Sequence, residues 1–210
     1  GIPVIVGTAG GSGATPHLDW AVDIVKEIAR EKKLSFKMAI IGSELDKELV
    51  KEKLRKGQVT PLHPAKEIAE KDVDEAVHIV AQIGEEPYIK ALDEGANVII
   101  AGRSYDPAVF AALAIKQGYD KALALHMGKI LECAAIAALP GSGSDCMFGY
   151  LRRDHFVLEP LSPLRKCTTL SIAAHTLYEK TNPYVLPGPG GALDLHECTF
   201  TQVDDNKVKV

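Results

Sequence analysis

An alternation of short apolar runs with helical stretches constrains the fold more than any other feature of the sequence. The first run, residues 2–6, ends at a glycine-rich turn over residues 7–13. A helical pattern then starts at Thr15 and Pro16 and continues to about Lys33, with Thr15 placed to cap the helix and Pro16 at its first position. The order strand, turn, helix is the repeating unit of parallel α/β folds.

The same unit recurs along the first two thirds of the chain. Further strands are expected over residues 35–41, 77–84 and 97–102, and helices over 43–56, 86–94, 106–117 and 119–139. Residues 60–75 are rich in proline and charge, and predict a surface connection with one short helix at 65–71. We therefore predict an α/β fold whose parallel sheet carries helices on both faces.

The pattern changes after the small-residue segment 140–144. Strands are expected around residues 152–154, a helix over 168–180, a loop at 187–191, and a final hairpin made of 193–203 and 207–210. About 65 residues make only a marginal core. We therefore predict one domain over residues 1–210, with its core in 1–144 and a strand-rich extension with antiparallel hairpins in 145–210.

Composition excludes several classes of partner and site. The chain has 210 residues, a net charge of −4 and 24 basic side chains spread among acidic ones, which disfavours a nucleic-acid surface. Its four cysteines form no C-x-x-C pair, so neither a zinc site nor a redox motif is indicated, and we expect no metal. Without a long apolar stretch or a signal peptide, a reduced cytoplasmic protein with no membrane partner is expected.

The turn after the first strand is a candidate anion site. Backbone N–H groups and the positive end of a helix dipole converge at such turns. The spacing fits neither a P-loop, since no lysine follows, nor a dinucleotide fingerprint, since Pro16 stands where the third glycine should be. The alternative is that the glycines only form a tight turn. The candidate ligand-binding residues here are Gly10, Gly11, Ser12, Gly13 and, in the first helical turn, His17.

A second group of polar residues follows the strand expected at 97–102. Ligands of parallel α/β sheets bind beyond the carboxyl ends of the strands, so the loop after this strand belongs to the candidate site. Arg103 offers a fixed cationic fork for a carboxylate or phosphate, and Ser104 and Tyr105 offer hydroxyl groups. Asp106 is a candidate acid or base, or else only the cap of the next helix.

A third group lies on the helix expected at 119–139. His126, Lys129 and Cys133 share one face, and Glu132 lies three residues after Lys129, within reach of its ammonium. Burial on this alanine-rich helix would shift the pKa values of these groups towards neutrality, so His126, Lys129, Glu132 and Asp106 are the candidate catalytic residues. The alternative is an ion pair at the solvent edge and a structural histidine. Cys133 is expected to fill the core, and His175 to be structural.

Several of these segments together resemble one known family. They are residues 6–14, 99–110, 125–133, 173–180 and 188–191. In these segments, and over essentially the whole chain, the sequence resembles the acyclic terpene utilisation AtuA family, formerly a domain of unknown function. Members usually carry a further N-terminal segment and continue beyond residue 210, so the resemblance implies a fragment of a longer protein. It implies a cytoplasmic role close to acyl-CoA chemistry, and it supplies no catalytic residues.

The leading hypothesis is an enzyme that acts on an acyl-CoA or a branched carboxylate by acid/base chemistry, as a lyase, hydratase or hydrolase. One alternative is a non-catalytic subunit that binds a ligand or organises other enzymes. The other is a transferase that uses phosphate or a nucleotide, with Asp106 as the candidate magnesium ligand. We expect no cofactor, with CoA entering only as part of the substrate. The expected partners are a small anionic substrate and a second copy of the chain, or the segments that it lacks.

Overall fold

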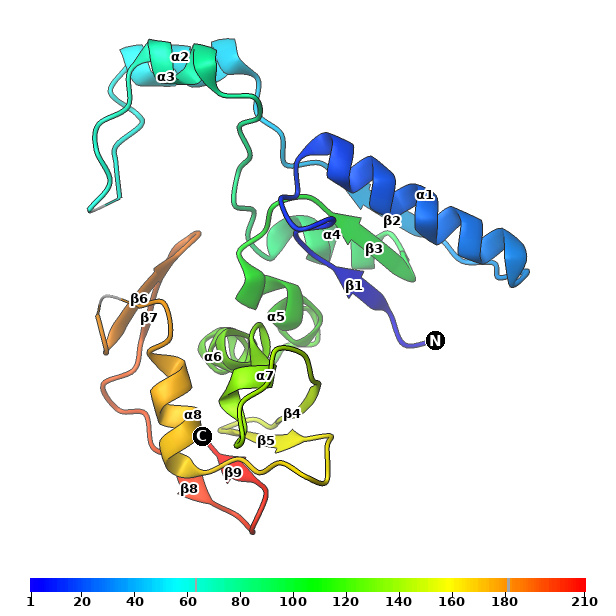
Figure 1. Cartoon of the computed structure of the whole chain (residues 1–210), viewed down its shortest axis with the longest axis vertical. Coiled ribbons are helices and arrows are strands. Elements are labelled where there is room, and N and C mark those ends of the chain that lie inside the picture. Colours follow the sequence, from blue (N-terminus) through cyan, green and yellow to red (C-terminus); the bar gives the residue numbers. More distant parts are fainter. Residues whose placement is uncertain (63, 181) are drawn as a thin grey trace. The chain divides into compact units, whose positions relative to one another are not determined.

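A computed structural model describes residues 1–62, 64–180 and 182–210 as a mixed α/β protein (Figure 1). The chain forms two compact units. Unit 1 consists of residues 1–83 and 97–104, and unit 2 of residues 84–96 and 105–210. These units do not follow the boundary expected at residue 144, because the helices after residue 105 group with the C-terminal strands. The single domain stays a prediction.

Unit 1 is built on a parallel sheet, as predicted. Its strand order is β1 (Val4–Val6), β3 (Val98–Ala101), β2 (Met38–Ile41). The helix α1 (Thr15–Glu31) packs on this sheet through Leu18 and Val22. Because β3 lies in the centre, the turn after β1 and the residues after β3 end side by side at one edge of the sheet.

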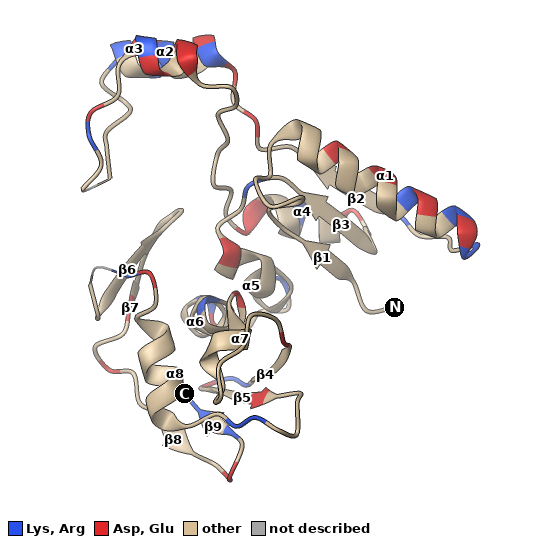
Figure 2. Ribbon diagram, in the orientation of Figure 1, with Lys and Arg blue, Asp and Glu red and all other residues tan. Residues whose placement is uncertain are grey.

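Two short charged helices complete unit 1. The helix α2 (Lys47–Arg55) is capped by Asp46 and begins four residues later than the helix expected over 43–56, and α3 (Glu70–Glu75) begins five residues later than expected. Basic and acidic side chains are interleaved along α2, α3 is mostly acidic (Figure 2), and ion pairs such as Lys51 with Asp74 join the two helices. The mixed charges of this segment are typical of a solvated face.

Two details predicted for unit 1 are wrong. Residues 77–84 form no strand and contribute only the isolated bridges Glu44–Val80 and Ile83–Ser104. Val77 is 84 % exposed and the other apolar side chains of this run are half-buried, and periodicity alone does not distinguish such a segment from a buried strand. The cap of α1 is Ala14, and Thr15 is already helical.

Unit 2 begins with helices. They are α4 (Glu86–Asp93), α5 (Asp106–Lys116), α6 (Lys121–Leu131) and the single turn α7 (Ala134–Ala137). The helix predicted over 119–139 is therefore interrupted, at residues 132 and 133. A Cβ atom on Gly128 would lie 2.4 Å from the carbonyl oxygen of Pro107, so this glycine allows α6 to approach the first turn of α5 closely.

Antiparallel strands and one helix form the rest of unit 2, as predicted for the C-terminal part. One sheet has the order β4 (Met147–Leu151), β5 (Phe156–Pro160), β9 (Val208–Lys209), β8 (Thr201–Gln202), and α8 (Thr169–Thr176) packs near it. Phe156, Leu158, Ile172 and Val208 are fully buried in the common core.

The loop predicted at residues 187–191 is wrong. The strands β6 (Val185–Gly188) and β7 (Gly191–Asp194) pair there as a hairpin. Gly190 adopts a φ of +78°, which glycine accepts without strain, so the glycines and prolines that indicated a loop build a tight turn. In the described part of the chain, no helix is both long and apolar enough to cross a membrane.

Candidate functional site

The glycine turn of unit 1 is shaped by contact with the residues after β3. Gly13 has a φ of +72°, and a Cβ atom there would lie 2.1 Å from the backbone nitrogen of Arg103. A Cβ atom on Gly102 would lie 2.7 Å from the Gly13 carbonyl oxygen. Both glycines are therefore required by the close approach of two backbone segments.

Arg103 fastens this turn. Its Nε donates to the carbonyl oxygen of Ser12 at 3.1 Å, and its Nη2 donates to that of Gly11 at 2.9 Å. The buried hydroxyl of Ser104 donates to the Gly102 carbonyl oxygen, and His17 Nδ1 lies 2.7 Å from the hydroxyl oxygen of Ser12. The arginine fork that the sequence assigns to a ligand thus holds the loop itself.

The N-terminus of α1 already holds a carboxylate of the same unit. Glu44 Oε2 accepts from the backbone N–H of Thr15 at 2.9 Å, and Glu44 Oε1 lies 2.7 Å from His78 Nδ1. The bond from Thr15, together with that to His78, holds the pKa of Glu44 below its usual value despite partial desolvation. The backbone N–H groups of Gly11 and Gly13 donate to carbonyl oxygens within the turn.

These contacts account for the residues expected to bind an anion in unit 1. Gly10 is held close to His17, because a Cβ atom on this glycine would lie 2.6 Å from the histidine Cβ. The ligand-binding role of this group stays a prediction. Sequence reasoning missed Ser43, whose hydroxyl accepts from Arg103 N–H at 2.7 Å, and Glu44, because the contacts of both cross the sheet edge between distant segments.

In unit 2, Lys129 and Glu132 form a buried ion pair at the end of α6. The Lys129 side chain is 1 % exposed and its ammonium donates to the Glu132 carboxylate, which is 11 % exposed. Burial raises the pKa of Glu132, and the bond from Lys129 only partly offsets this effect. The predicted pairing is therefore present, but it lies in the interior and not at the solvent edge.

Further titratable groups surround this pair. The negative charge of Asp106, the first residue of α5, also raises the pKa of Glu132. Burial raises the pKa of Tyr105, and the charge of Glu132 adds to this effect. Tyr178, which follows α8, places its ring centre 5.6 Å from Lys129 Nζ. Burial together with the charge of Lys129 lowers the pKa of His175, which lies on α8.

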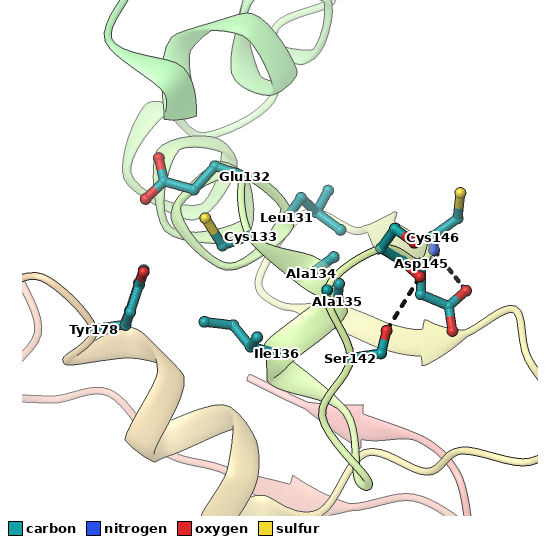
Figure 3. A pocket seen from close by; sticks show the side chains of 12 residues that line it. Leu131, Glu132, Cys133, Ala134, Ala135, Ile136, Ser142, Asp145, Cys146 and Tyr178 are labelled. Atoms are coloured by element: carbon teal, nitrogen blue, oxygen red, sulfur yellow. Dashed lines mark hydrogen bonds between the residues drawn. The ribbon is translucent and has the colours of Figure 1, made fainter. Parts of the chain in front are cut away.

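A pocket of about 710 Å³ opens beside the pair (Figure 3). Glu132, Cys133 and Tyr178 line one part of this pocket, and the segments 134–136 and 142–146 line the rest. The side chains of Glu132 and Cys133 come from the break between α6 and α7, where the chain turns away from its helical path. The interruption of the predicted helix thus places a carboxyl group with a raised pKa at a cavity.

His126 does not join this group. Its Nε2 lies 3.2 Å from the hydroxyl oxygen of Thr176, and its Nδ1 lies 3.7 Å from Cys198 Sγ. Its ring packs in T-shaped contacts against the rings of Phe156 and Phe200. Burial lowers the pKa of His126 to about 4. Of the four candidate catalytic residues, the structure associates Lys129, Glu132 and Asp106. The charge of Lys129 acts on the pKa of His175, which is expected to be structural, whereas burial alone lowers the pKa of His126.

Among the described residues, no three His, Cys, Asp or Glu side chains gather in a way that could hold a metal ion.

Comparison with known proteins identifies the chain by its family. Neither the curated proteins nor the solved structures contain a match to the chain. The model of the acyclic terpene utilisation family protein AtuA matches residues 4–140, which include the glycine turn, Arg103 to Asp106 and the Lys129–Glu132 pair. The chain therefore belongs to the AtuA family of acyclic terpene utilisation proteins.

Proposed function

We propose that the protein is an enzyme that removes a proton next to the carbonyl of an acyl-CoA or branched carboxylate, with Glu132 as the acid/base group. The observation that carries this proposal is Glu132 at the wall of the 710 Å³ pocket, held from behind by the buried Lys129. Family membership suggests involvement in acyclic terpene utilisation, and a carbon acid of this class suits that role.

The environment of Glu132 suits a general base for a weak acid. A carboxylate with an ordinary pKa is too weak a base for a proton next to a carbonyl, and catalysis improves as the pKa approaches the working pH. Burial and the charge of Asp106 both raise the pKa of Glu132. The carboxyl group therefore gains basicity while it still reaches the pocket.

Lys129 acts as a positioning residue in this proposal. Its side chain is 1 % exposed and lies outside the pocket lining, so it holds Glu132 and does not touch the substrate. The Tyr178 ring, which lines the same pocket, lies over the ammonium. In the reaction, Glu132 would accept the proton from the α-carbon, and the C–H electron pair would move towards the carbonyl oxygen to give an enolate. Lyase reactions that eliminate a group β to the carbonyl, including the dehydration catalysed by a hydratase, begin with this step.

Hydrogen–deuterium exchange at the α-carbon tests the proposal directly. The protein is incubated in D₂O with a panel of straight and branched acyl-CoA thioesters and free carboxylates, and deuterium incorporation is followed by NMR. We expect exchange with at least one member, and a rate about 100-fold lower for Glu132→Gln, the usual contribution of a general base. Lys129→Met should move the pH profile of exchange, because it removes the charge that lowers the pKa of Glu132.

The chain offers a matched control on its surface. Lys71 and Glu75 form an exposed ion pair on α3, and the variant Lys71→Met/Glu75→Gln should exchange deuterium like the unmodified protein. Exchange that is unchanged in Glu132→Gln would overturn the assignment. Thermal stabilisation by a thioester with no exchange from any substrate would favour the non-catalytic ligand-binding subunit. The phosphate- or nucleotide-using transferase is disfavoured, since Glu44 occupies the N-terminus of α1.

A further inference from the structure

A cysteine, a histidine and a threonine from three segments of unit 2 form a second polar group. Cys198 lies between β7 and β8, His126 lies on α6, and Thr176 is the last residue of α8. The Cys198 Sγ to His126 Nδ1 distance is 3.7 Å, and the His126 Nε2 to Thr176 Oγ1 distance is 3.2 Å. A nucleophile, a base and a group that orients the base are the parts of a nucleophilic centre.

The hydrogen bonds fix which nitrogen of His126 carries the proton. Thr176 Oγ1 donates its only hydrogen to the carbonyl oxygen of Ile172 at 3.1 Å, because a carbonyl can only accept. Towards His126, Thr176 Oγ1 is therefore the acceptor, and Nε2 carries the hydrogen. A neutral imidazole has one N–H group, so Nδ1 has a free lone pair that accepts the thiol proton of Cys198.

The surroundings keep both groups neutral. His126 is 4 % exposed and is flanked by the rings of Phe156 and Phe200, and burial lowers its pKa to about 4. Burial also raises the pKa of the half-buried Cys198. The histidine is thus an unprotonated base at neutral pH, and the cysteine is a thiol.

Both residues line one pocket of about 260 Å³. Its wall is largely apolar, from Leu193, Leu195 and Val210. The charged side chains that line it are Asp154, Asp194 and Glu197, all of them exposed, and Asp154 and Asp194 are each paired with a neighbouring histidine. An apolar wall with a thiol and a base fits a short acyl group, and it offers no cation for a free carboxylate.

We propose that Cys198 is a nucleophile that accepts an acyl group from a thioester, with His126 as its general base and Thr176 as the positioning residue. In the step, Sγ attacks the carbonyl carbon while the thiol proton passes to His126 Nδ1. The carbon–sulfur bond of the donor thioester then breaks, and the departing thiolate takes the proton from Nδ1. The products are acyl-Cys198 and the donor's thiol, so no further reactant is needed. The geometry of this pair is independent of Glu132.

Acylation with a small thioester tests the proposal. The protein is incubated with S-butyryl-N-acetylcysteamine, and the modified cysteine and the rate are determined by mass spectrometry. We expect acylation at Cys198, and no acylation there in Cys198→Ser after the same time. The surface variant Lys71→Met/Glu75→Gln provides the control, since it should leave the adduct and its rate unchanged.

The pH dependence distinguishes general-base catalysis from ordinary thiol reactivity. A solvated thiol reacts through its thiolate, so its rate falls about tenfold for each pH unit below its pKa. Since His126 remains unprotonated down to a pH of about 4, acylation of Cys198 should change little between about pH 5 and pH 7. Free glutathione, measured with the same thioester, supplies the reference slope.

Variants of the base and its orienting group complete the test. His126→Gln keeps a donor towards Thr176 but lacks the base. It should slow acylation, by less than the roughly 100-fold expected for a base whose pKa lies near the working pH, because the pKa of His126 is about 4. Thr176→Val removes the acceptor and should also slow acylation, whereas Thr176→Ser should restore it. Acylation confined to Cys146, a pH slope like that of glutathione, or an equal rate in His126→Gln would each overturn the proposal. If a variant does not fold, nitrogen NMR of unmodified His126 decides, because a proton on Nδ1 contradicts the assignment.

Discussion

At the scale of single residues, unit 2 buries ionisable side chains whose charge states depend on their surroundings. His126 and Lys129 are three residues apart on α6, yet the histidine meets aromatic rings and the lysine meets a carboxylate. Desolvation therefore lowers the pKa of the histidine, whereas the lysine lies in an ion pair. Residues that share one helical face in the sequence serve separate roles in the structure.

The lowered pKa of His126 predicts a loss of stability in mild acid. Its pKa falls from 6.5 to about 4 on folding, so its contribution to the free energy of unfolding is complete above pH 6.5 and is lost as the pH falls from 6.5 to 4. The full loss is about 3 kcal/mol, since one pKa unit corresponds to about 1.4 kcal/mol. Urea unfolding at a series of pH values should show this slope, and His126→Gln should reduce it.

The difference in slope between the unmodified protein and His126→Gln isolates the contribution of His126. The raised pKa of Glu132 acts in the opposite sense and the lowered pKa of His175 in the same sense, but both are present in each protein. An equal slope in His126→Gln would contradict burial of a neutral His126.

At the scale of elements, the glycine turn is fixed by a neighbouring segment and not by its own sequence alone. The strand, turn and helix were predictable from the pattern of residues 2–33, because the alternation of apolar runs and caps is local. The close approach of Gly13 to Arg103 was not, since it joins segments about 90 residues apart.

Two glycines with similar backbone angles give a matched comparison. Gly13 has a φ of +72° against the Arg103 backbone, and Gly57 has a φ of +63° with nothing within 4 Å of its Cβ position. Gly57→Ala should lower the free energy of unfolding by about 1 kcal/mol, the strain of a left-handed conformation. Gly13→Ala should lower it by at least about 3 kcal/mol, because the collision adds to the strain. Equal losses in urea unfolding would show that the two segments separate easily.

At the scale of the whole molecule, the two compact units are interleaved in sequence. Residues 84–96 belong to unit 2 although they lie between segments of unit 1. Compact units of this kind often open as separate cooperative segments.

This organisation predicts a local response to a local change. In Gly13→Ala, amide hydrogen exchange should accelerate in α1 and β3, whereas the amides of α6 and β5 should keep their protection, because they belong to the other unit. Mass spectrometry of exchanged peptides provides the measurement. The surface variant Gly57→Ala serves as the control for a change without collision, and uniform acceleration over both units would indicate a single cooperative domain.

The sequence by itself determined the elements whose signals are local. The parallel strands β1, β2 and β3, the helices α1, α2, α4 and α5, and the pairing of Lys129 with Glu132 all follow from periodicity, caps and helical spacing. The family followed from short motifs, three of which lie within the matched residues 4–140. Such features depend on neighbours along the chain, which the sequence displays directly.

Only the tertiary structure decided where polar groups converge. The Glu44 carboxylate at the start of α1, the burial of Lys129 and the association of Cys198 with His126 each join residues or surfaces that are distant in sequence. Two wrong predictions have the same cause. The apolar run 77–84 forms only isolated bridges in place of a strand, and the glycine-rich run 187–191 belongs to a hairpin in place of a loop. Burial and hydrogen-bond partners depend on which segments pack together, and the local pattern does not contain that information.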